Sequence, residues 1–179
     1  MVPSTLINVK NLGISFQQRK LLEGLSFSVQ TGQLLALIGA NGCGKSTVLR
    51  VLHARKNNNE EPDNDDISLS GDISKAPNLE VALLPQSLRT PGGIWSSLTD
   101  PSPEPTGLEG KLVCEFGLDD YLSPADQLSE GQLQKRALVH TLLADCDLYL
   151  FDEPTNYLDI TGITAFEQHV ERLKRGGKG

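Results

Sequence analysis

The stretch Gly39-Ala40-Asn41-Gly42-Cys43-Gly44-Lys45-Ser46-Thr47 decides the fold of this chain. It matches the pattern G-x-x-x-x-G-K-[ST] at every fixed position. The apolar run at residues 33–38 comes before it and predicts a buried parallel strand. Residues 46–54 come after it and predict a helix. The glycines therefore stand at a strand-to-helix turn, which is the context that the pattern requires.

Such a turn is suited to holding a phosphate group. Its glycines let several backbone N–H groups point at one anion, and the helix N-terminus adds partial positive charge. We expect Lys45 to reach the β- and γ-phosphates and Ser46 to offer its hydroxyl to Mg²⁺. The alternative is a glycine-rich turn with a chance lysine, which the flanking strand and helix disfavour. The predicted phosphate-binding residues are Gly39, Asn41, Gly42, Cys43, Gly44, Lys45, Ser46 and Thr47.

Length and composition narrow the class of protein. A chain of 179 residues suits one domain, with room for a small subdomain. It has no apolar run long enough to cross a membrane and no signal-peptide pattern. The net charge of −7 argues against a free-standing nucleic-acid binder, because phosphate contacts need lysine and arginine. Three widely spaced cysteines predict no zinc site and favour a reducing, cytoplasmic setting.

The N-terminal part predicts a β-layer. Residues 6–9 and 25–29 alternate apolar and polar side chains, as half-buried strands of an antiparallel layer do, and residues 67–73 resume this pattern. Phe16 could stack on a nucleotide base or pack within the layer, and its spacing does not decide between them. Residues 55–66 are polar and acidic and predict a mobile surface loop rather than a metal site.

The middle of the chain predicts a small inserted subdomain. Residues 81–84 form a second candidate for a buried strand, and Pro85-Gln86 end it. Residues 87–127 are rich in Pro, Gly, Ser and Asp, with helical pieces at 94–98 and 108–116, and Trp95 is expected in their core.

A second glycine-containing loop opens a second helix. Ser129 is a suitable N-cap and Gln132 stands three residues later, as in a capping box, before helix-forming residues 133–144. The helix N-terminus is a potential anion site, although an ordinary capped helix is equally consistent with this pattern.

Two carboxylates follow the third strand candidate, residues 148–151. Asp152 and Glu153 stand at the C-terminal tip of this strand, where α/β proteins bind ligands. Strand alternation points them to different sides, so one can face Mg²⁺ and the other the attacking water. A solvated acidic turn is the disfavoured alternative, because the strand is wholly apolar. Residues 160–175 predict the next helix.

Together these motifs resemble those of the ATP-binding cassette (ABC) ATPases. The resemblance rests on the phosphate loop at 39–47, Gln86 as the Q-loop glutamine, Leu128-Ser129-Glu130-Gly131-Gln132 as the signature loop, residues 148–154 as the Walker B strand and Leu158-Asp159 as the D-loop. Phe16 falls where that family has its base-stacking aromatic residue. The resemblance implies one α/β domain over residues 1–179: a P-loop NTPase core with a mostly parallel sheet, an antiparallel β-layer, and a helical subdomain at about 87–145.

The resemblance also implies a reaction, ATP + H₂O → ADP + phosphate. Lys45 and the loop would hold the phosphates, while Ser46, Gln86 and Asp152 would arrange Mg²⁺. Glu153 would orient or deprotonate the attacking water. The expected catalytic residues are Glu153, Gln86 and Lys45. Ser129 and Gly131 would meet the γ-phosphate of ATP held by a second cassette in a head-to-tail dimer.

The motifs do not decide which subgroup of the ABC ATPases this chain resembles most. Residues 153–159 resemble the E-P-T-N-x-L-D of the ABC-F proteins, which are soluble and act on ribosomes, and residues 147–153 also look like the ribosome-recycling ABC ATPase. The expected function is a cytoplasmic, ribosome-associated ATPase. The alternatives are the ATP-binding subunit of a membrane transporter, whose membrane subunit would meet residues 87–127, and a nucleotide-binding module with little turnover.

In the family, a further strand follows the D-loop helix and ends in a switch histidine. The residues after Asp159 suffice for about one helix, and His53, His140 and His169 stand elsewhere. The resemblance therefore implies a truncated cassette and a monomer that is a poor ATPase.

Overall fold

The structure is a computed structural model that describes residues 3–17, 19–54, 67–90, 93–94 and 105–179. It divides into two compact units. The first unit comprises Met1–Leu83, Cys146–Leu150 and Leu173–Gly179, and the second comprises Leu84–Asp145 and Phe151–Arg172. The predicted helical subdomain at about 87–145 stays a prediction, although the second unit includes these residues.

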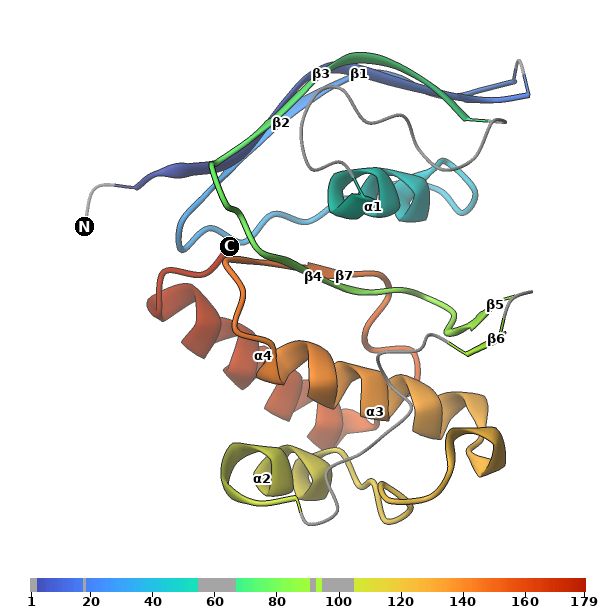
Figure 1. Cartoon of the computed structure of the whole chain (residues 1–179), viewed down its shortest axis with the longest axis vertical. Coiled ribbons are helices and arrows are strands. Elements are labelled where there is room, and N and C mark those ends of the chain that lie inside the picture. The colour runs from blue at the N-terminus through green and yellow to red at the C-terminus, as the bar shows by residue number, and fades with distance from the viewer. Residues whose placement is uncertain (1–2, 18, 55–66, 91–92, 95–104) are drawn as a thin grey trace. The chain divides into compact units, whose positions relative to one another are not determined.

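The first unit contains the predicted antiparallel β-layer. Strands β1 (Thr5–Phe16), β2 (Arg19–Gln30) and β3 (Ile67–Lys75) lie side by side in the order β2-β1-β3 (Figure 1). Both partners of β1 are antiparallel to it, and Val9 of the central strand pairs with a residue on each side. The apolar side chains of β1 before Phe16 are buried, and burial alternates along residues 25–29 of β2, which confirms the half-buried pattern read from the sequence.

Two of the predicted buried strands form a parallel pair. Strands β4 (Val81–Leu84) and β7 (Leu148–Phe151) are neighbours in a two-stranded sheet. The amide of Asp152 donates to the carbonyl of Leu84 over 2.9 Å, and the Leu148 amide donates to the carbonyl four residues before Leu84. The register advances in the same direction along both strands, so they run parallel.

The strand predicted at residues 33–38 is not formed. These residues carry no strand assignment, and the described part of the chain has no backbone hydrogen bond to residues 34–38. Leu34, Leu35 and Ile38 are 64%, 40% and 95% exposed. The physical reason is pairing: an apolar run becomes a buried strand only beside another strand. Strand β7 instead pairs with β4 and, through its second residue, with Gly179.

Helix α1 (Lys45–Ala54) follows the glycine-rich loop and confirms the predicted helix. It buries Val48, Val51 and Leu52, which recur at helical spacing on one face. This buried face fixes the helix in the first unit, and its N-terminus stays directed at the loop.

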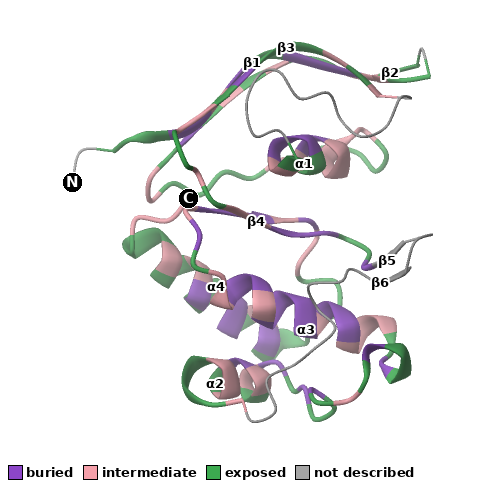
Figure 2. Ribbon diagram, in the orientation of Figure 1, coloured by how far each residue is buried: buried purple, intermediate pink, exposed green. Residues whose placement is uncertain are grey.

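The second unit is built from helices. It holds α2 (Gly107–Glu115), the 3₁₀ turn η2 (Ala125–Gln127), α3 (Glu130–Leu143) and most of α4 (Ile160–Arg175). Figure 2 shows α3 buried over most of its length. Its buried residues are Leu133, Gln134, Arg136, Ala137, Leu138, Val139, Thr141 and Leu142. The predicted helices at 108–116, 133–144 and 160–175 are confirmed.

Other expectations concern residues near the uncertain segments. Ile94 lies in the short strand β6 (Gly93–Ile94), which pairs with β5 (Arg89–Thr90), so the helix predicted at 94–98 is wrong at its first residue. A backbone hydrogen-bonded across a ladder cannot also begin a helix. The remainder of that segment, Trp95 and the acidic loop at 55–66 fall outside the described residues. Among the described helices, none has the length and apolar character to cross a membrane.

Candidate nucleotide-binding site

The loop at residues 39–47 belongs to the first unit and turns directly into α1. Gly42 and Gly44 have φ angles of 78° and 98°, in the region that favours glycine. A Cβ atom on Gly39 would lie 2.8 Å from the Sγ atom of Cys43, so the loop also closes on itself too tightly for a side chain there. Gly42 and Gly44, of which Gly44 stands at a fixed position of the pattern, thus have backbone conformations that a side chain would strain.

The start of α1 presents unused hydrogen-bond donors. The first intrahelical bond of this region runs from the amide of Val48 to the carbonyl of Gly44 over 2.9 Å. The amides of Lys45, Ser46 and Thr47 make no hydrogen bond to any described residue. Such donors at a helix N-terminus, with the positive end of its dipole, are the features that bind phosphate.

The Lys45 side chain folds over the loop. Its ammonium donates to the carbonyl of Gly39 over 2.9 Å and to that of Ala40 over 3.1 Å. A phosphate oxygen would form a stronger, charge-assisted bond with the same ammonium. The structure therefore places the lysine, the glycines and the free amides of the predicted phosphate site together. Asn41 is exposed within this loop.

Phe16 ends strand β1, also in the first unit. It pairs with Arg19 on one side and with Ile67 on the other, and it remains 38% exposed. Of the two alternatives for this residue, packing within the layer is disfavoured, because the ring is not enclosed. Stacking of its ring on a base stays a prediction.

The second unit brings Gln86 and Glu153 into direct contact. The Gln86 side-chain amide donates to Oε2 of Glu153 over 2.8 Å. The same oxygen accepts from the side-chain amide of Asn156 over 2.7 Å. Glu153 has a φ of 51°, which is rare for a residue with a Cβ and is typical of functional sites.

Asp152 directly follows the end of strand β7. It is 4% exposed, and no hydrogen bond from the described residues reaches its carboxylate. Glu153 is only half-buried. The two carboxylates therefore differ in burial, one enclosed and the other partly open to solvent, while the predicted strand alternation does not apply because both residues follow the end of β7.

The signature loop forms the capped helix start that the sequence predicts. The Ser129 hydroxyl accepts from the Gln132 amide over 3.3 Å, and Gln132 Oε1 accepts from the Ser129 amide over 2.8 Å. Gly131 lies beneath the ring of Tyr157, since a Cβ there would lie 3.3 Å from the ring. The structure thus shows the ordinary role of this loop as a helix cap, and its role as an anion site stays a prediction.

The three histidines are each surrounded by, or paired with, other residues of the protein. Burial lowers the pKa of His53, and the charge of Lys75 lowers it further. Burial also lowers the pKa of His140, whose ring stacks near Tyr121. His169 is buried and pairs with a carboxylate of α2, at 2.8 Å. None of the three is itself a predicted site residue, although His53 lies in α1 with Lys45 and His140 lies in α3 with Gly131.

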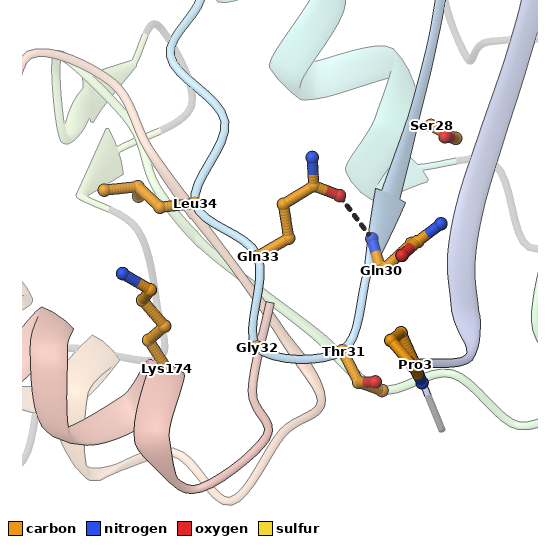
Figure 3. Close-up of a pocket in the computed structure, with 8 residues that line it drawn as sticks. All are labelled: Pro3, Ser28, Gln30, Thr31, Gly32, Gln33, Leu34 and Lys174. Carbon is orange, nitrogen blue, oxygen red and sulfur yellow. Dashed lines mark hydrogen bonds between the residues drawn. The ribbon is translucent and has the colours of Figure 1, made fainter. Parts of the chain in front are cut away.

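A separate hollow in the first unit lies at the end of β2 (Figure 3). It has a volume of about 500 Å³ and is lined by Pro3, Ser28, Gln30, Thr31, Gly32, Gln33, Leu34 and Lys174. The Gln33 side chain accepts a hydrogen bond from the Gln30 amide over 3.0 Å and closes the end of the strand. The hollow contains no predicted site residue.

The predicted site residues thus form two groups. The phosphate loop and Phe16 belong to the first unit, and Gln86, Ser129, Gly131, Asp152 and Glu153 belong to the second. Sequence reasoning assigned no role to Asn156 or Tyr157, although both lie in a motif that it quoted. The i, i+3 spacing of Glu153 and Asn156 in a turn was the available signal.

Comparison with known proteins identifies a matching family. The family model described as "ABC transporter" matches residues 22–156. A relative in Pseudomonas fluorescens, the "Zinc import ATP-binding protein ZnuC", is 30% identical over 178 residues. That alignment covers 96% of this chain and 64% of the relative. The chain therefore spans less than two thirds of that protein's length.

Solved structures show the same fold. A structure described as the ATP-binding subunit of an ABC transporter has a TM-score of 0.72 at 27% identity, and the match covers 97% of this chain and 77% of that one. The archaeal ribosome recycling factor aABCE1, solved with ribosomal stalk protein aP1, has a TM-score of 0.73 at 26% identity. That match covers 99% of this chain and 33% of the factor.

Proposed function

Because this chain belongs to the ABC transporter family, as an ATPase nucleotide-binding domain, we propose that it binds Mg²⁺·ATP and hydrolyses it as the ATP-binding subunit of a membrane transporter. The observation that carries the hydrolytic part is Glu153, held by two amides at a strained backbone position. The transporter part is supported by the zinc import relative and by the solved ATP-binding subunit.

Phosphate binding is the first element of the proposal. The free amides of residues 45–47 and the ammonium of Lys45 supply donors around one concave loop. Backbone amides preorganised in this way cost little entropy when an anion arrives. Phe16 would stack on the base through its exposed ring.

Mg²⁺ fits the donors that these residues offer. The Asp152 carboxylate is enclosed and accepts no hydrogen bond from the described residues, and a buried charge in that state is stabilised by a cation. Ser46 would add its hydroxyl and Gln86 its side-chain carbonyl, so all three donors are oxygens, as Mg²⁺ prefers. When bound, the ion would neutralise charge on the β- and γ-phosphates.

Glu153 would serve as the base of the reaction. The water oxygen forms a bond to the γ-phosphorus, the bond from that phosphorus to the β–γ bridging oxygen breaks, and the water proton passes to the Glu153 carboxylate. ADP and phosphate are the products. Catalysis of this kind rests mainly on positioning and electrostatic stabilisation, since the metaphosphate-like transition state demands little covalent chemistry.

A second cassette would complete the site. Ser129 and Gly131 stand at the N-terminus of α3, and this helix start would meet the γ-phosphate of ATP held by the partner. If the partner is a second copy, the arrangement is isologous and places two ATP molecules in the interface. The proposed setting is the cytoplasmic face of a membrane, beside a transmembrane subunit.

Ribosome association is the second candidate. It is supported by the likeness to the ribosome recycling factor and by the E-P-T-N-x-L-D pattern at 153–159, which resembles the ABC-F subgroup. The transporter function is the better supported of the two. This chain covers a larger share of the length of the transporter ATP-binding proteins than of the ribosome recycling factor.

The test has two arms. Phosphate release from Mg²⁺·ATP by the purified chain tests hydrolysis, with Lys45→Ala as the matched negative. Purification of the tagged protein from its own cells, with ATP present, tests whether it associates with a membrane subunit or with ribosomes. Recovery with an integral membrane subunit is the expected result, and sedimentation with ribosomes instead would replace the first candidate by the second. No phosphate release above Lys45→Ala would overturn the hydrolytic proposal.

A further inference from the structure

Two side-chain amides donate hydrogen bonds to the Glu153 carboxylate, and both donate to the same oxygen. Gln86 Nε2 lies 2.8 Å from Oε2, and Asn156 Nδ2 lies 2.7 Å from it. Oε1 accepts no hydrogen bond from the residues that the structure describes. One oxygen of the carboxylate is therefore fixed by the protein while the other is left for a ligand.

Asn156 is placed for this contact by the turn that it belongs to. The Asn156 amide donates to the Glu153 carbonyl over 3.3 Å, and the Leu158 amide donates to the Thr155 carbonyl over 3.1 Å. These bonds curl residues 153–158 into two overlapping turns. The left-handed backbone of Glu153 starts the first of them and points the side chain of Asn156 back over the carboxylate.

The C-terminal end of this segment is anchored at two points. Tyr157, the next residue, packs its ring against Gly131 of the signature loop. Asp159 accepts from the amide of Gly162 over 2.7 Å and so caps the start of α4. The Asn156 amide is therefore carried on fixed backbone, so its bond to Glu153 costs little conformational entropy.

The two donors differ in what else they can serve. Gln86 follows β4 and is a proposed Mg²⁺ ligand, whereas the Asn156 side chain bonds to no described residue other than Glu153. Asn156 can therefore hold the carboxylate whatever Gln86 binds. A hydrogen bond to an ionised group is among the stronger ones, and here it also fixes the direction of the other oxygen.

We propose that Asn156 is a positioning residue that fixes Oε2 of Glu153, so that Oε1 is the atom that takes the proton of the attacking water. This inference rests on the proposed ATP hydrolysis. Asn156 would act through Glu153, the residue that its side-chain amide contacts. The proton passes from water to Oε1 as the water oxygen bonds to the γ-phosphorus.

The test compares three variants with the wild type. Asn156→Asp keeps the shape of the side chain but replaces the donor by a like charge, and Asn156→Ala removes the donor. Thr155→Ala is the matched control, because Thr155 is an exposed neighbour whose side chain has no recorded hydrogen bond. Thermal unfolding of each variant reports whether the fold is retained.

The expected result is a fall in kcat of roughly ten- to a hundredfold in both Asn156 variants, which is the worth of a hydrogen bond to a charged group. KM for ATP should stay within about twofold, as expected when only the reaction step is affected. Thr155→Ala should match the wild type. Wild-type kcat in Asn156→Asp, or a change confined to KM, would overturn the inference.

A second measurement needs no turnover. In ¹⁵N-labelled protein, the side-chain NH₂ signals of Asn156, identified by their loss in Asn156→Asp, should move in Glu153→Gln and stay in Thr155→Ala. Unmoved signals in Glu153→Gln would overturn the inference. A wild type that shows the expected NMR shift but releases no phosphate would instead overturn the proposed hydrolysis.

Discussion

Gln86 and Glu153, 67 residues apart in the chain, are joined by a hydrogen bond of 2.8 Å from the glutamine amide to the carboxylate. The first follows strand β4 and the second follows β7, and these strands are parallel neighbours. Their carboxyl ends therefore deliver both side chains to one edge of the sheet, where α/β proteins place their ligands. The Q-loop glutamine and the carboxylate after the Walker B strand, which are separate motifs in the sequence, are thus joined by one hydrogen bond.

Replacement of Gln86 by alanine should remove one donor to Glu153 and one proposed Mg²⁺ ligand. We expect the turnover rate to fall roughly tenfold or more, and the Mg²⁺ concentration that gives half the maximal rate to rise. The lost donor and the lost Mg²⁺ ligand both act on the reacting phosphate. Phosphate release measured across a Mg²⁺ titration checks this. An unchanged Mg²⁺ requirement would remove Gln86 from the metal site.

Lys45→Ala should weaken ATP binding by about ten- to a hundredfold, since the ammonium is the only side-chain cation within the described loop. A calorimetric titration with Mg²⁺·ATP measures the change. Lys111→Ala, on exposed helix surface in the second unit, is the matched control and should bind as the wild type does. Equal affinity in Lys45→Ala would refute the phosphate-loop assignment.

The two proposed roles of Ser129 can be separated. Ser129→Ala should lower the free energy of unfolding by about 1 kcal/mol, because it loses the cap of α3. Ser129→Asp restores a good N-cap but adds negative charge where a partner's γ-phosphate would lie. We expect near wild-type unfolding in urea for Ser129→Asp, with no ATP-dependent dimer by sizing. A Ser129→Asp protein that dimerises as the wild type would exclude the signature loop from the dimer site.

Glu115 should make the stability of the second unit depend on pH. Its carboxylate lies 2.8 Å from His169 and 3.5 Å from Lys111. Burial acts to raise the pKa of Glu115, but the hydrogen bonds and charges of His169 and Lys111 outweigh it, so the pKa lies below its ordinary value of 4.5. A carboxyl with a lowered folded-state pKa stabilises the protein above that ordinary value and loses the contribution as the pH falls through the lowered pKa.

The free energy of unfolding should therefore decline as the pH falls below about 4.5, and this decline should be shallower in Glu115→Gln. Urea unfolding of both proteins at several pH values between neutral and strongly acidic checks the slopes. Identical slopes would show that the Glu115 pairings contribute nothing to the acid sensitivity.

Local patterns predicted most of the fold. The periodicity of α1 and α4 and the alternation in β2 come from side chains meeting one buried face, which sequence records directly. The cap at Ser129 was predicted because it is also a local feature: its partner Gln132 is three residues away in the chain. The glycine-rich loop was predicted because its residues are contiguous in sequence, and Gly44 at a fixed position has a φ of 98° that favours glycine.

Pairing between distant segments was harder to predict. Residues 33–38 have the composition of a buried strand, yet Ile38 is 95% exposed, because composition does not say whether a neighbouring strand is present. The contact of Asn156 with Glu153 was missed for a different reason. It depends on the left-handed backbone at Glu153, and a φ of 51° at a glutamate has no signature in sequence.

The most direct test of the account measures phosphate release by the wild type and by Glu153→Gln, at ATP concentrations that saturate both. We predict equal ATP affinity, steady release by the wild type, and release at least a hundredfold slower in Glu153→Gln, because the variant lacks the proton acceptor. Equal rates of release in the two proteins would contradict the assignment of Glu153 as the base and the mechanism built on it.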